Sequence, residues 1–253
     1  MHFTIRAITL DLDDTLWPFA PIGARIEQVL DDWLRIHSPR TAERFPVPTM
    51  RALRERVFAS HPQLLHDMSE LRRLTLERAF IESDADPAQV VALTQAAYDV
   101  FYAERNRVEC YPDALAALAR ISAKLPVAAL SNGNADLVAI GLDHHFAFQL
   151  GAREHGAAKP EASIFLAACE RLGCAPHEVL HVGDHTEMDV LGAARAGLRT
   201  AWIQREDAHH PHWPHQDMQP DLIVADMGAL ADHLDRMAAA HSPPETMSSG
   251  VHP

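Results

Sequence analysis

The sequence predicts an α/β fold in which an all-helical insertion interrupts a doubly wound sheet of parallel strands. From Tyr111 onward, short apolar runs alternate with stretches that carry apolar residues at helical spacing. This alternation is typical of a parallel sheet with helices on both faces. One further apolar run lies near the N-terminus, and residues 18–106 after it show helical spacing without a convincing strand.

The first predicted element is a short buried strand over residues 5–10, IRAITL. It is mostly apolar at consecutive positions, as is typical of a strand buried on both faces. Asp11, Asp13 and Asp14 follow it directly. Like charges this close together repel, so the cluster itself needs a physical explanation.

The remaining elements follow from periodicity and from the prolines and glycines that separate them. Four helices are predicted in the insertion, over residues 22–37, 50–60, 71–81 and 87–106. The later elements are a helix over 111–121 with Pro112 in its first turn, a strand over 126–131, a helix near 135–141, a strand near 146–150, a helix over 161–173, a strand over 178–183, a helix over 188–197, strands over 199–203 and 221–225, and a helix over 228–240.

These elements divide the chain into two domains. We predict an α/β core of residues 1–16 and 107–241, a helical domain of residues 17–106, and a disordered tail over 242–253. The histidine-rich run 209–215 is expected to be a surface loop and not a metal site, because its prolines deny it regular geometry. Ligands of open parallel sheets bind beyond the carboxyl ends of the strands, so the inserted helical domain is placed to cover that site.

The composition restricts the partners of this protein. A formal net charge of −13 disfavours nucleic acid and anionic membrane surfaces as partners. The sequence has no apolar run near the ~20 residues of a membrane span, and no N-terminal signal peptide. Its three cysteines are dispersed, as is typical of reduced thiols. We therefore expect a cytoplasmic monomer or weak homodimer that acts on a small molecule.

The first candidate site motif is the pair Asp11 and Asp13. Residues i and i+2 at a strand end point to the same side, so both carboxylates can address one spot. Such a pair can form a metal site, or it can supply a nucleophile and an acid/base group. Taken alone, such a pair is more often a solvated turn or a helix cap than a functional site.

Two further motifs supply groups that bind phosphate. Ser131, Asn132 and Gly133 end the next strand and offer a hydroxyl and backbone N–H groups near a helix start. Taken alone, these three residues are ordinary turn chemistry. Lys159 stands before Pro160 at the start of the next helix, from which its ammonium can reach the acidic cluster.

A second acidic pair, Asp184 and Asp189, follows the strand over residues 178–183. Asp184 or Thr186 could instead cap the following helix. The argument for a site is joint, because an acid pair, a hydroxyl, a lysine and a second acid pair each lie at the end of a core element. Those ends converge in a doubly wound sheet, so the sequence predicts one site made of all four.

In the order DLDDT, SN, KP and GDxxxxD, these motifs resemble the haloacid dehalogenase superfamily. The resemblance covers the whole predicted core and implies a Rossmann-like fold. The helical insertion after the first motif resembles the C1 cap of subfamily I. The dehalogenases of the superfamily lack an aspartate at the position of Asp13, so its presence here favours phosphoryl transfer over carbon–halogen cleavage.

The resemblance also implies a mechanism. Asp11 would attack phosphorus and form an aspartyl-phosphate, and Asp13 would protonate the leaving group and then activate water. Asp13 must then carry a proton at neutral pH, a form that neighbouring anions favour. Mg²⁺ would screen the repulsion between Asp11 and the phosphate. The implied metal ligands are Asp11, the backbone carbonyl of Asp13 and Asp184, with Asp189 in an indirect role; the implied phosphate-binding groups are Ser131, the backbone of Asn132, Gly133 and the catalytic Lys159.

Two stretches narrow the expected substrate. LLHDMSELRR (64–73) and LSNGNADL (130–137) resemble the bacterial phosphatases that act on flavin mononucleotide and on the phosphoribitylamino-pyrimidine intermediate of riboflavin biosynthesis. In the helical domain we expect His66, Asp67 and Arg72 to face the substrate. The alternative for these three residues is an N-cap with solvated charges.

Two other functions fit parts of the pattern. One is a phosphatase or phosphomutase for a sugar phosphate or phosphoglycolate in the same superfamily. The other is a signalling receiver domain, which also combines acidic residues, a Ser/Thr and a lysine on a doubly wound sheet. A receiver carries its phosphoacceptor on a later strand than its acidic pair and has no long helical insertion, whereas Asp11 and Asp13 share one strand end.

Overall fold

The computed structural model describes residues 4–205 and 212–241, and its core is one sheet of six parallel strands. The strand order is β3-β2-β1-β4-β5-β6. The strands are β1 (Ala7–Leu10), β2 (Val127–Ser131), β3 (Phe148–Gly151), β4 (Val179–Gly183), β5 (Arg199–Ile203) and β6 (Leu222–Val224). Because β1 lies at the centre and is fully buried, the residues that follow it are delivered to the middle of the sheet edge.

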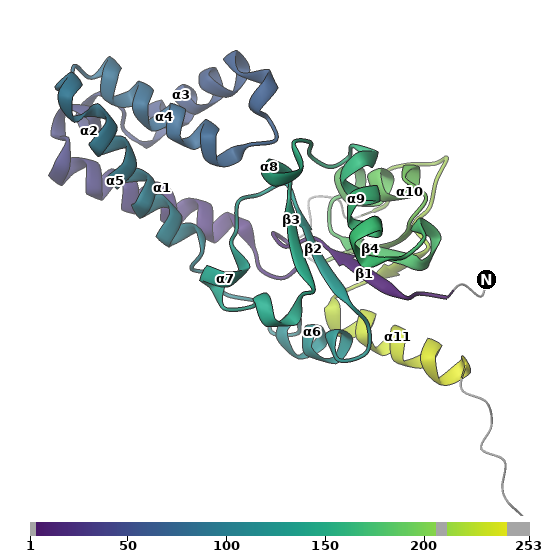
Figure 1. Cartoon of the computed structure of the whole chain (residues 1–253). Helices are drawn as coiled ribbons and strands as arrows, with labels where there is room; N and C mark the ends of the chain where they lie inside the picture. The colour runs from purple at the N-terminus through teal and green to yellow at the C-terminus, as the bar shows by residue number, and fades with distance from the viewer. Residues whose placement is uncertain (1–3, 206–211, 242–253) are drawn as a thin grey trace, which may run out of the picture.

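Helices cover both faces of the sheet (Figure 1). The α-helices are α1 (Phe19–His37), α2 (Pro39–Arg44), α3 (Val47–Ser60), α4 (Met68–Glu82), α5 (Pro87–Arg105), α6 (Ala114–Ser122), α7 (Leu137–Ile140), α8 (Ala152–His155), α9 (Ala162–Leu172), α10 (Gly192–Arg195) and α11 (Met227–His241). Ile8 and Leu10 pack with residues of α6 and α11, whereas Ala7 packs with residues of α9 and α10. This alternation follows from the two-residue period of a strand and makes both faces of β1 apolar.

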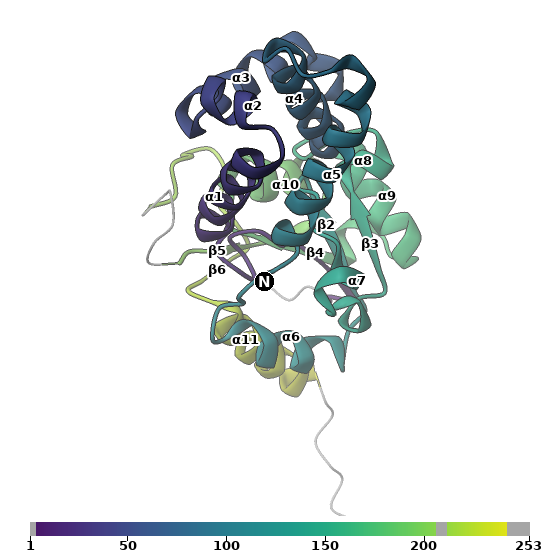
Figure 2. The same cartoon turned by 90° about the vertical axis from the view of Figure 1, so that its left-hand side faces the viewer.

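The helices α1–α5, which we call the helical cap, lie between β1 and α6 in the sequence and form one group beside the core (Figures 1 and 2). Apolar residues such as Leu71 and Phe80 are fully buried within this group. Burial of each such side chain contributes roughly 1.5–3 kcal/mol. Buried residues of α1 and α5 also belong to the same apolar cluster as β1 and α6, so the helical cap packs directly onto the core.

The predicted fold class is confirmed, and the differences are local. The short helices α2 and α8 were not predicted, and the helix expected from 111 begins at Ala114, so that Pro112 lies in the turn before it. The helix expected over 188–197 is a π-helical segment, Thr186–Leu191, followed by α10. The proposed domain boundaries stay a prediction.

Two predicted segments are only partly observable. The tail over 242–253 lies outside the described residues, and so do the first three residues, 209–211, of the histidine-rich run. In the described part of that run, Trp213 contacts the ring of Trp202 edge-on at 5.4 Å between ring centroids. Among the described residues, no helix is both long enough and apolar enough to cross a bilayer.

Candidate active site

The carboxyl ends of three neighbouring strands bring the predicted motifs together. Asp11 follows β1, Ser131 ends β2 and Asp184 follows β4, and β1 lies between the other two strands. Lys159 stands three residues before α9 and is only 3% exposed. The convergence expected from the order of the motifs is therefore present in the structure.

Lys159 is the cationic centre of this group. Its Nζ atom donates to Asp11 Oδ1 at 2.5 Å and to Asp189 Oδ1 at 2.6 Å. Burial by itself would lower the pKa of Lys159, but the two carboxylates outweigh it and raise that pKa above its ordinary value. Lys159 is therefore a charged ammonium at neutral pH, held by two charge-assisted hydrogen bonds.

Asn132 fixes the backbone of Lys159. The Asn132 side chain accepts from the Lys159 backbone N–H at 2.7 Å and donates to the Lys159 carbonyl at 2.8 Å. The sequence predicted a role for the Asn132 backbone and gave no indication of this pairing, because the two residues are 27 positions apart. The Ser–Asn motif thus positions the lysine across the sheet edge.

Three carboxylates form a group that could hold a metal ion. Asp11, Asp184 and Asp189 each offer an oxygen, and these oxygens lie within 4.8 Å of one another. Burial, reinforced by Asp189 and Asp11, raises the pKa of Asp184 to about 8. Burial also raises the pKa of Asp11 to about 7, against the opposing effect of Lys159.

The charge of this group fits a divalent cation. When all three carboxylates are ionised they exceed the Lys159 ammonium by two negative charges, and burial, which raises the pKa values of Asp11 and Asp184, makes that excess unfavourable. Mg²⁺ prefers a small number of carboxylate oxygens, as offered here. The residues present therefore fit the ion that the sequence resemblance implies.

Asp189 is engaged by more donors than the sequence suggested. Its Oδ1 also lies 3.2 Å from Nε2 of His181, and its Oδ2 accepts from the His185 backbone N–H at 3.0 Å. Burial opposes ionisation of Asp189, but Lys159 and His181 outweigh it, so its pKa is held well below the usual range. Asp189 thus stays ionised and anchors Lys159.

His181 is a site-supporting residue that sequence reasoning missed. It lies in β4, is 1% exposed, and places Nδ1 at 2.9 Å from Thr9 Oγ1. Burial lowers its pKa, so the ring is neutral at neutral pH and bridges Thr9 and Asp189. The available signal was one polar residue inside the otherwise apolar run VLHVG.

Asp13 has partners that the sequence did not predict. Its Oδ2 accepts from Nη2 of Arg105 at 2.6 Å, and its Oδ1 accepts from Nε1 of Trp17 at 2.8 Å. Arg105 is 2% exposed and ends α5 in the helical cap. We had expected neighbouring anions to determine the state of Asp13, whereas its direct charged partner is a cation.

The turn after β2 lies against Asp13. The Gly133 N–H donates to Ser131 Oγ at 3.0 Å. A Cβ atom on Gly133 would lie 2.7 Å from Asp13 Oδ2 and 3.0 Å from Nη2 of Arg105. Any larger residue at position 133 would displace the Asp13 carboxylate or the Arg105 guanidinium, so the Ser131–Gly133 turn and Asp13 line the same small space.

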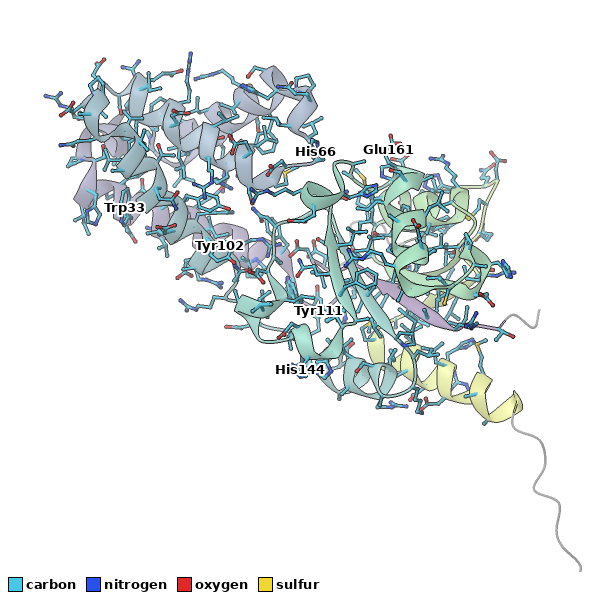
Figure 3. The ribbon with its side chains drawn as sticks, viewed as in Figure 1. Trp33, His66, Tyr102, Tyr111, His144 and Glu161 are labelled. Atoms are coloured by element: carbon cyan, nitrogen blue, oxygen red, sulfur yellow. The ribbon has the colours of Figure 1, made fainter. Side chains whose placement is uncertain are left out.

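A cleft of about 350 Å³ lies between the helical cap and the core. Its lining includes His66, Ser69 and Tyr102 from the helical cap, and Asn134, Asp136 and Glu154 from the core. Figure 3 shows His66 at the end of the helical cap that faces α8, and Tyr102 where α5 approaches the core. His66 is thus at a position where it can contact a ligand.

The other two residues predicted in the helical domain have different surroundings. Asp67 is the N-cap of α4, where it accepts from the Glu70 N–H at 2.9 Å, and it also pairs with Arg153 at 3.3 Å. Arg72 does not line the cleft: it lines a cavity inside the helical cap with Glu27, and its guanidinium lies 4.7 Å from the Phe101 ring centroid. Arg72 is one helical turn further along α4 than Met68, which lines the cleft.

The family follows from a comparison with known proteins. A family model described as haloacid dehalogenase-like hydrolase matches residues 5–197. The chain belongs to this family. The expected superfamily is therefore confirmed, and with it the expectation of a hydrolase.

Individual relatives of this haloacid dehalogenase-like hydrolase include phosphatases. The 5-amino-6-(5-phospho-D-ribitylamino)uracil phosphatase YigB of Escherichia coli K12 is 30% identical over 226 residues, 89% of this chain and 94% of that protein. A glyceraldehyde 3-phosphate phosphatase of Methanopyrus kandleri is 30% identical over 245 residues, 92% of this chain and 99% of that protein. Both support the expected phosphate-ester chemistry.

The solved structures add a relative of another kind. The crystal structure of a 2-haloacid dehalogenase from Pseudomonas syringae pv. Tomato DC3000 matches with a TM-score of 0.85 at 32% identity, over 92% of this chain and 99% of that chain. The fold is thus common to both kinds of enzyme. The reaction has to be argued from the residues of the site.

Proposed function

We propose that this protein is a Mg²⁺-dependent phosphatase that hydrolyses a small phosphate monoester through an aspartyl-phosphate on Asp11. The observation that supports this most is the set of buried charges around Asp11, with Lys159 at 2.5 Å and two further carboxylates within 4.8 Å. The phosphatases among its relatives favour the same reaction class.

In the first step, an Asp11 oxygen attacks phosphorus, and the bond between phosphorus and the ester oxygen breaks. Lys159 binds Oδ1 of Asp11, so it orients the carboxylate and offsets its charge. The leaving oxygen takes a proton from Asp13 and departs as an alcohol. In the second step, Asp13 takes a proton from a water molecule, which attacks the aspartyl-phosphate and releases phosphate and Asp11.

Two donors hold the side chain of Asp13 in the described conformation. Both oxygens of Asp13 accept hydrogen bonds, from Arg105 and from Trp17. Each of these oxygens keeps a second lone pair, which can carry the proton that Asp13 transfers. The orientation of Asp13 therefore depends on Arg105, which belongs to the helical cap.

A bound Mg²⁺ would be held by Asp11, Asp184 and the backbone carbonyl of Asp13, beside Asp189, and would offset negative charge on the phosphoryl oxygens. The need for such an offset is large. Two unit charges 4 Å apart interact by about 4 kcal/mol at an effective dielectric constant of about 20. A phosphate dianion would meet three carboxylates, and Lys159 already pairs with Asp11 and Asp189.

For the substrate we propose flavin mononucleotide or the phosphoribitylaminouracil intermediate of riboflavin biosynthesis. The support is the similarity to YigB over 89% of this chain, together with a polar cleft beside the site. A second candidate is a phosphatase or phosphomutase for a smaller sugar phosphate or phosphoglycolate, which the similarity to the glyceraldehyde 3-phosphate phosphatase favours. A receiver domain has no support from these relatives.

A substrate screen with the purified protein tests the proposal. We expect Mg²⁺-dependent release of phosphate from flavin mononucleotide and p-nitrophenyl phosphate, and loss of that release in EDTA. A haloacid such as 2-chloropropionate serves as the competing substrate, because a dehalogenase is among the similar structures. Release of chloride without release of phosphate would overturn the proposed reaction.

A further inference from the structure

The charges of the cleft suggest which phosphate esters the site accepts. We propose that the cleft selects substrates whose alcohol part is hydroxyl-rich and carries no negative charge, and that Glu154 and Asp136 exclude carboxylate-bearing phosphates. This inference rests on the proposed phosphatase function. It concerns the substrate class and not the chemistry at phosphorus.

The cleft begins where the phosphoryl site ends. Gly133 lines the cleft, and the position of its missing Cβ lies 2.7 Å from Asp13 Oδ2 and 3.4 Å from Ser131 Oγ. The group attached to the ester oxygen therefore extends past Gly133 into the cleft. Its volume of about 350 Å³ falls within the ~300–1,000 Å³ of small-molecule sites.

Asp136 contributes a fixed negative charge to the cleft. Its Oδ1 caps α7 by accepting from the Val138 N–H at 2.9 Å, and its Oδ2 accepts from the Tyr102 hydroxyl. Burial opposes ionisation, but Tyr102 and the helix N–H groups outweigh it and lower the pKa of Asp136. The same contact raises the pKa of Tyr102 to about 12, so Tyr102 keeps its proton and directs it to Asp136.

Glu154 adds a second carboxylate to the lining of the cleft. It lines the cleft from α8, and a Cβ on Gly151 would lie 2.3 Å from Glu154 Oε2. The carboxylate therefore lies directly over Gly151, which also lines the cleft. Among the described lining residues, Arg153 is the one arginine or lysine, and it pairs with Asp67 at 3.3 Å.

This lining offers acceptors for hydroxyl groups and repulsion for anions. Carboxylate oxygens accept hydrogen bonds and have none to donate. A hydroxyl can donate to Asp136 or Glu154, whereas a carboxylate on the substrate would meet two like charges, and the cation in the lining, Arg153, is already paired with Asp67. Lys159 cannot offset the charge of a substrate carboxylate, since Asp11 and Asp189 hold the lysine in the phosphoryl site.

A matched pair of substrates tests the selection. Glycerol 3-phosphate and 3-phosphoglycerate differ at one terminal carbon, which is a hydroxymethyl group in the first and a carboxylate in the second. With wild-type protein and Mg²⁺ we expect kcat/KM for glycerol 3-phosphate to exceed that for 3-phosphoglycerate by at least about tenfold. Equal or reversed values would overturn the inference.

Variants of Glu154 test where the selection arises. The preference is the ratio of kcat/KM for glycerol 3-phosphate to kcat/KM for 3-phosphoglycerate. Glu154→Gln should reduce this ratio by at least about threefold through faster turnover of 3-phosphoglycerate, and Glu154→Lys should reduce it further. Glu170→Gln on the exposed surface of α9 removes the same charge away from the cleft and should keep the preference. A preference that survives both Glu154 variants, or that Glu170→Gln reduces equally, would overturn the role of the cleft.

Failure of the proposed phosphatase function would give a different experimental result from failure of the charge selection. The wild-type protein would then release no phosphate from p-nitrophenyl phosphate in Mg²⁺, and the selection would fall with it. Hydrolysis of p-nitrophenyl phosphate without discrimination by charge would refute the selection alone.

Discussion

Two buried cations, Lys159 and Arg105, pair with the aspartates that follow β1, but they are held by different parts of the molecule. Lys159 contacts Asp11 and Asp189, and all three residues lie in the core. Arg105 ends the last helix of the helical cap and reaches across to Asp13 and, through Nε at 3.1 Å, to Asn134. Asp11, the proposed nucleophile, is thus fixed by the core alone, whereas Asp13, the proposed acid/base residue, also contacts the helical cap.

The largest loss of activity is expected from a change at Asp11, in the ion pair with Lys159. Asp11→Asn keeps the shape of the side chain and removes the attacking oxygen anion, so kcat should fall by at least about 10⁴-fold, as for loss of a nucleophile. The assay is phosphate release in Mg²⁺. Asp32→Asn on the exposed side of α1 is the control and should retain full activity. Substantial turnover by pure Asp11→Asn protein would remove the basis of the proposed mechanism.

Lys159→Met should damage both activity and stability. It leaves Asp11 and Asp189 buried without their ammonium, which typically costs about 3–5 kcal/mol of unfolding free energy, and kcat should fall by about 10²–10³-fold. Urea denaturation and phosphate release measure the two effects. Lys124→Met is a matched control, because Lys124 is 54% exposed and its pair with Asp235 is worth at most about 1 kcal/mol. Equal stability of the two variants would contradict a buried charge centre.

The metal-free protein should lose stability as the pH rises. In the folded state the pKa of Asp11 is about 7 and that of Asp184 about 8, against 3.8 for each in the unfolded chain. Between about pH 4 and pH 8 the folded state therefore binds protons that the unfolded chain has released, and this contribution to stability falls with rising pH.

Urea denaturation in EDTA, at pH values across that window, measures this trend. Mg²⁺ should restore stability most above about pH 8, where both carboxylates are ionised. Asp184→Asn is the control. It removes a carboxyl whose pKa is raised to about 8, so the free energy of unfolding should depend less on pH. A Mg²⁺ effect that is equal in Asp184→Asn would place the ion elsewhere.

A smaller effect is expected at the pair that joins the helical cap to the core. Arg105→Ala releases Asp13 Oδ2, so kcat should fall by about 10- to 100-fold while KM changes little, because positioning and not binding is lost. Added guanidinium ion should restore part of the activity. Arg107→Ala, which removes a 70% exposed neighbour, is the control. A change in KM alone would show that Arg105 binds substrate instead of positioning Asp13.

The core could be predicted from the sequence because its signals are local. Buried parallel strands are apolar at consecutive positions, and the candidate site residues lie at their carboxyl ends: Asp11 directly follows β1, and Ser131 is the last residue of β2. Residues that act through partners far along the chain gave no such signal. Arg105 lies 92 positions from Asp13, and His181 lies inside an apolar run.

In the helical cap, too, the sequence did not predict which residues the polar side chains contact. Helical spacing located its helices, but the surroundings of a polar residue on a helix depend on which neighbour packs there. His66 lines the cleft, and its contact with substrate stays a prediction, whereas Arg72 lies with Glu27 and Phe101 inside the helical cap. Helix propensity contains no information about this choice, because the free energy comes from tertiary contacts.

The sequence by itself determined the parallel sheet, the helical insertion and the order of the charged groups along the sheet edge, because apolar periodicity and strand direction are properties of short segments. The tertiary structure alone decided how the charges pair: Lys159 with Asp11 and Asp189, and Arg105 with Asp13. Electrostatic energy depends on the distance through space and on burial, and neither is specified until the helical cap and the core pack together.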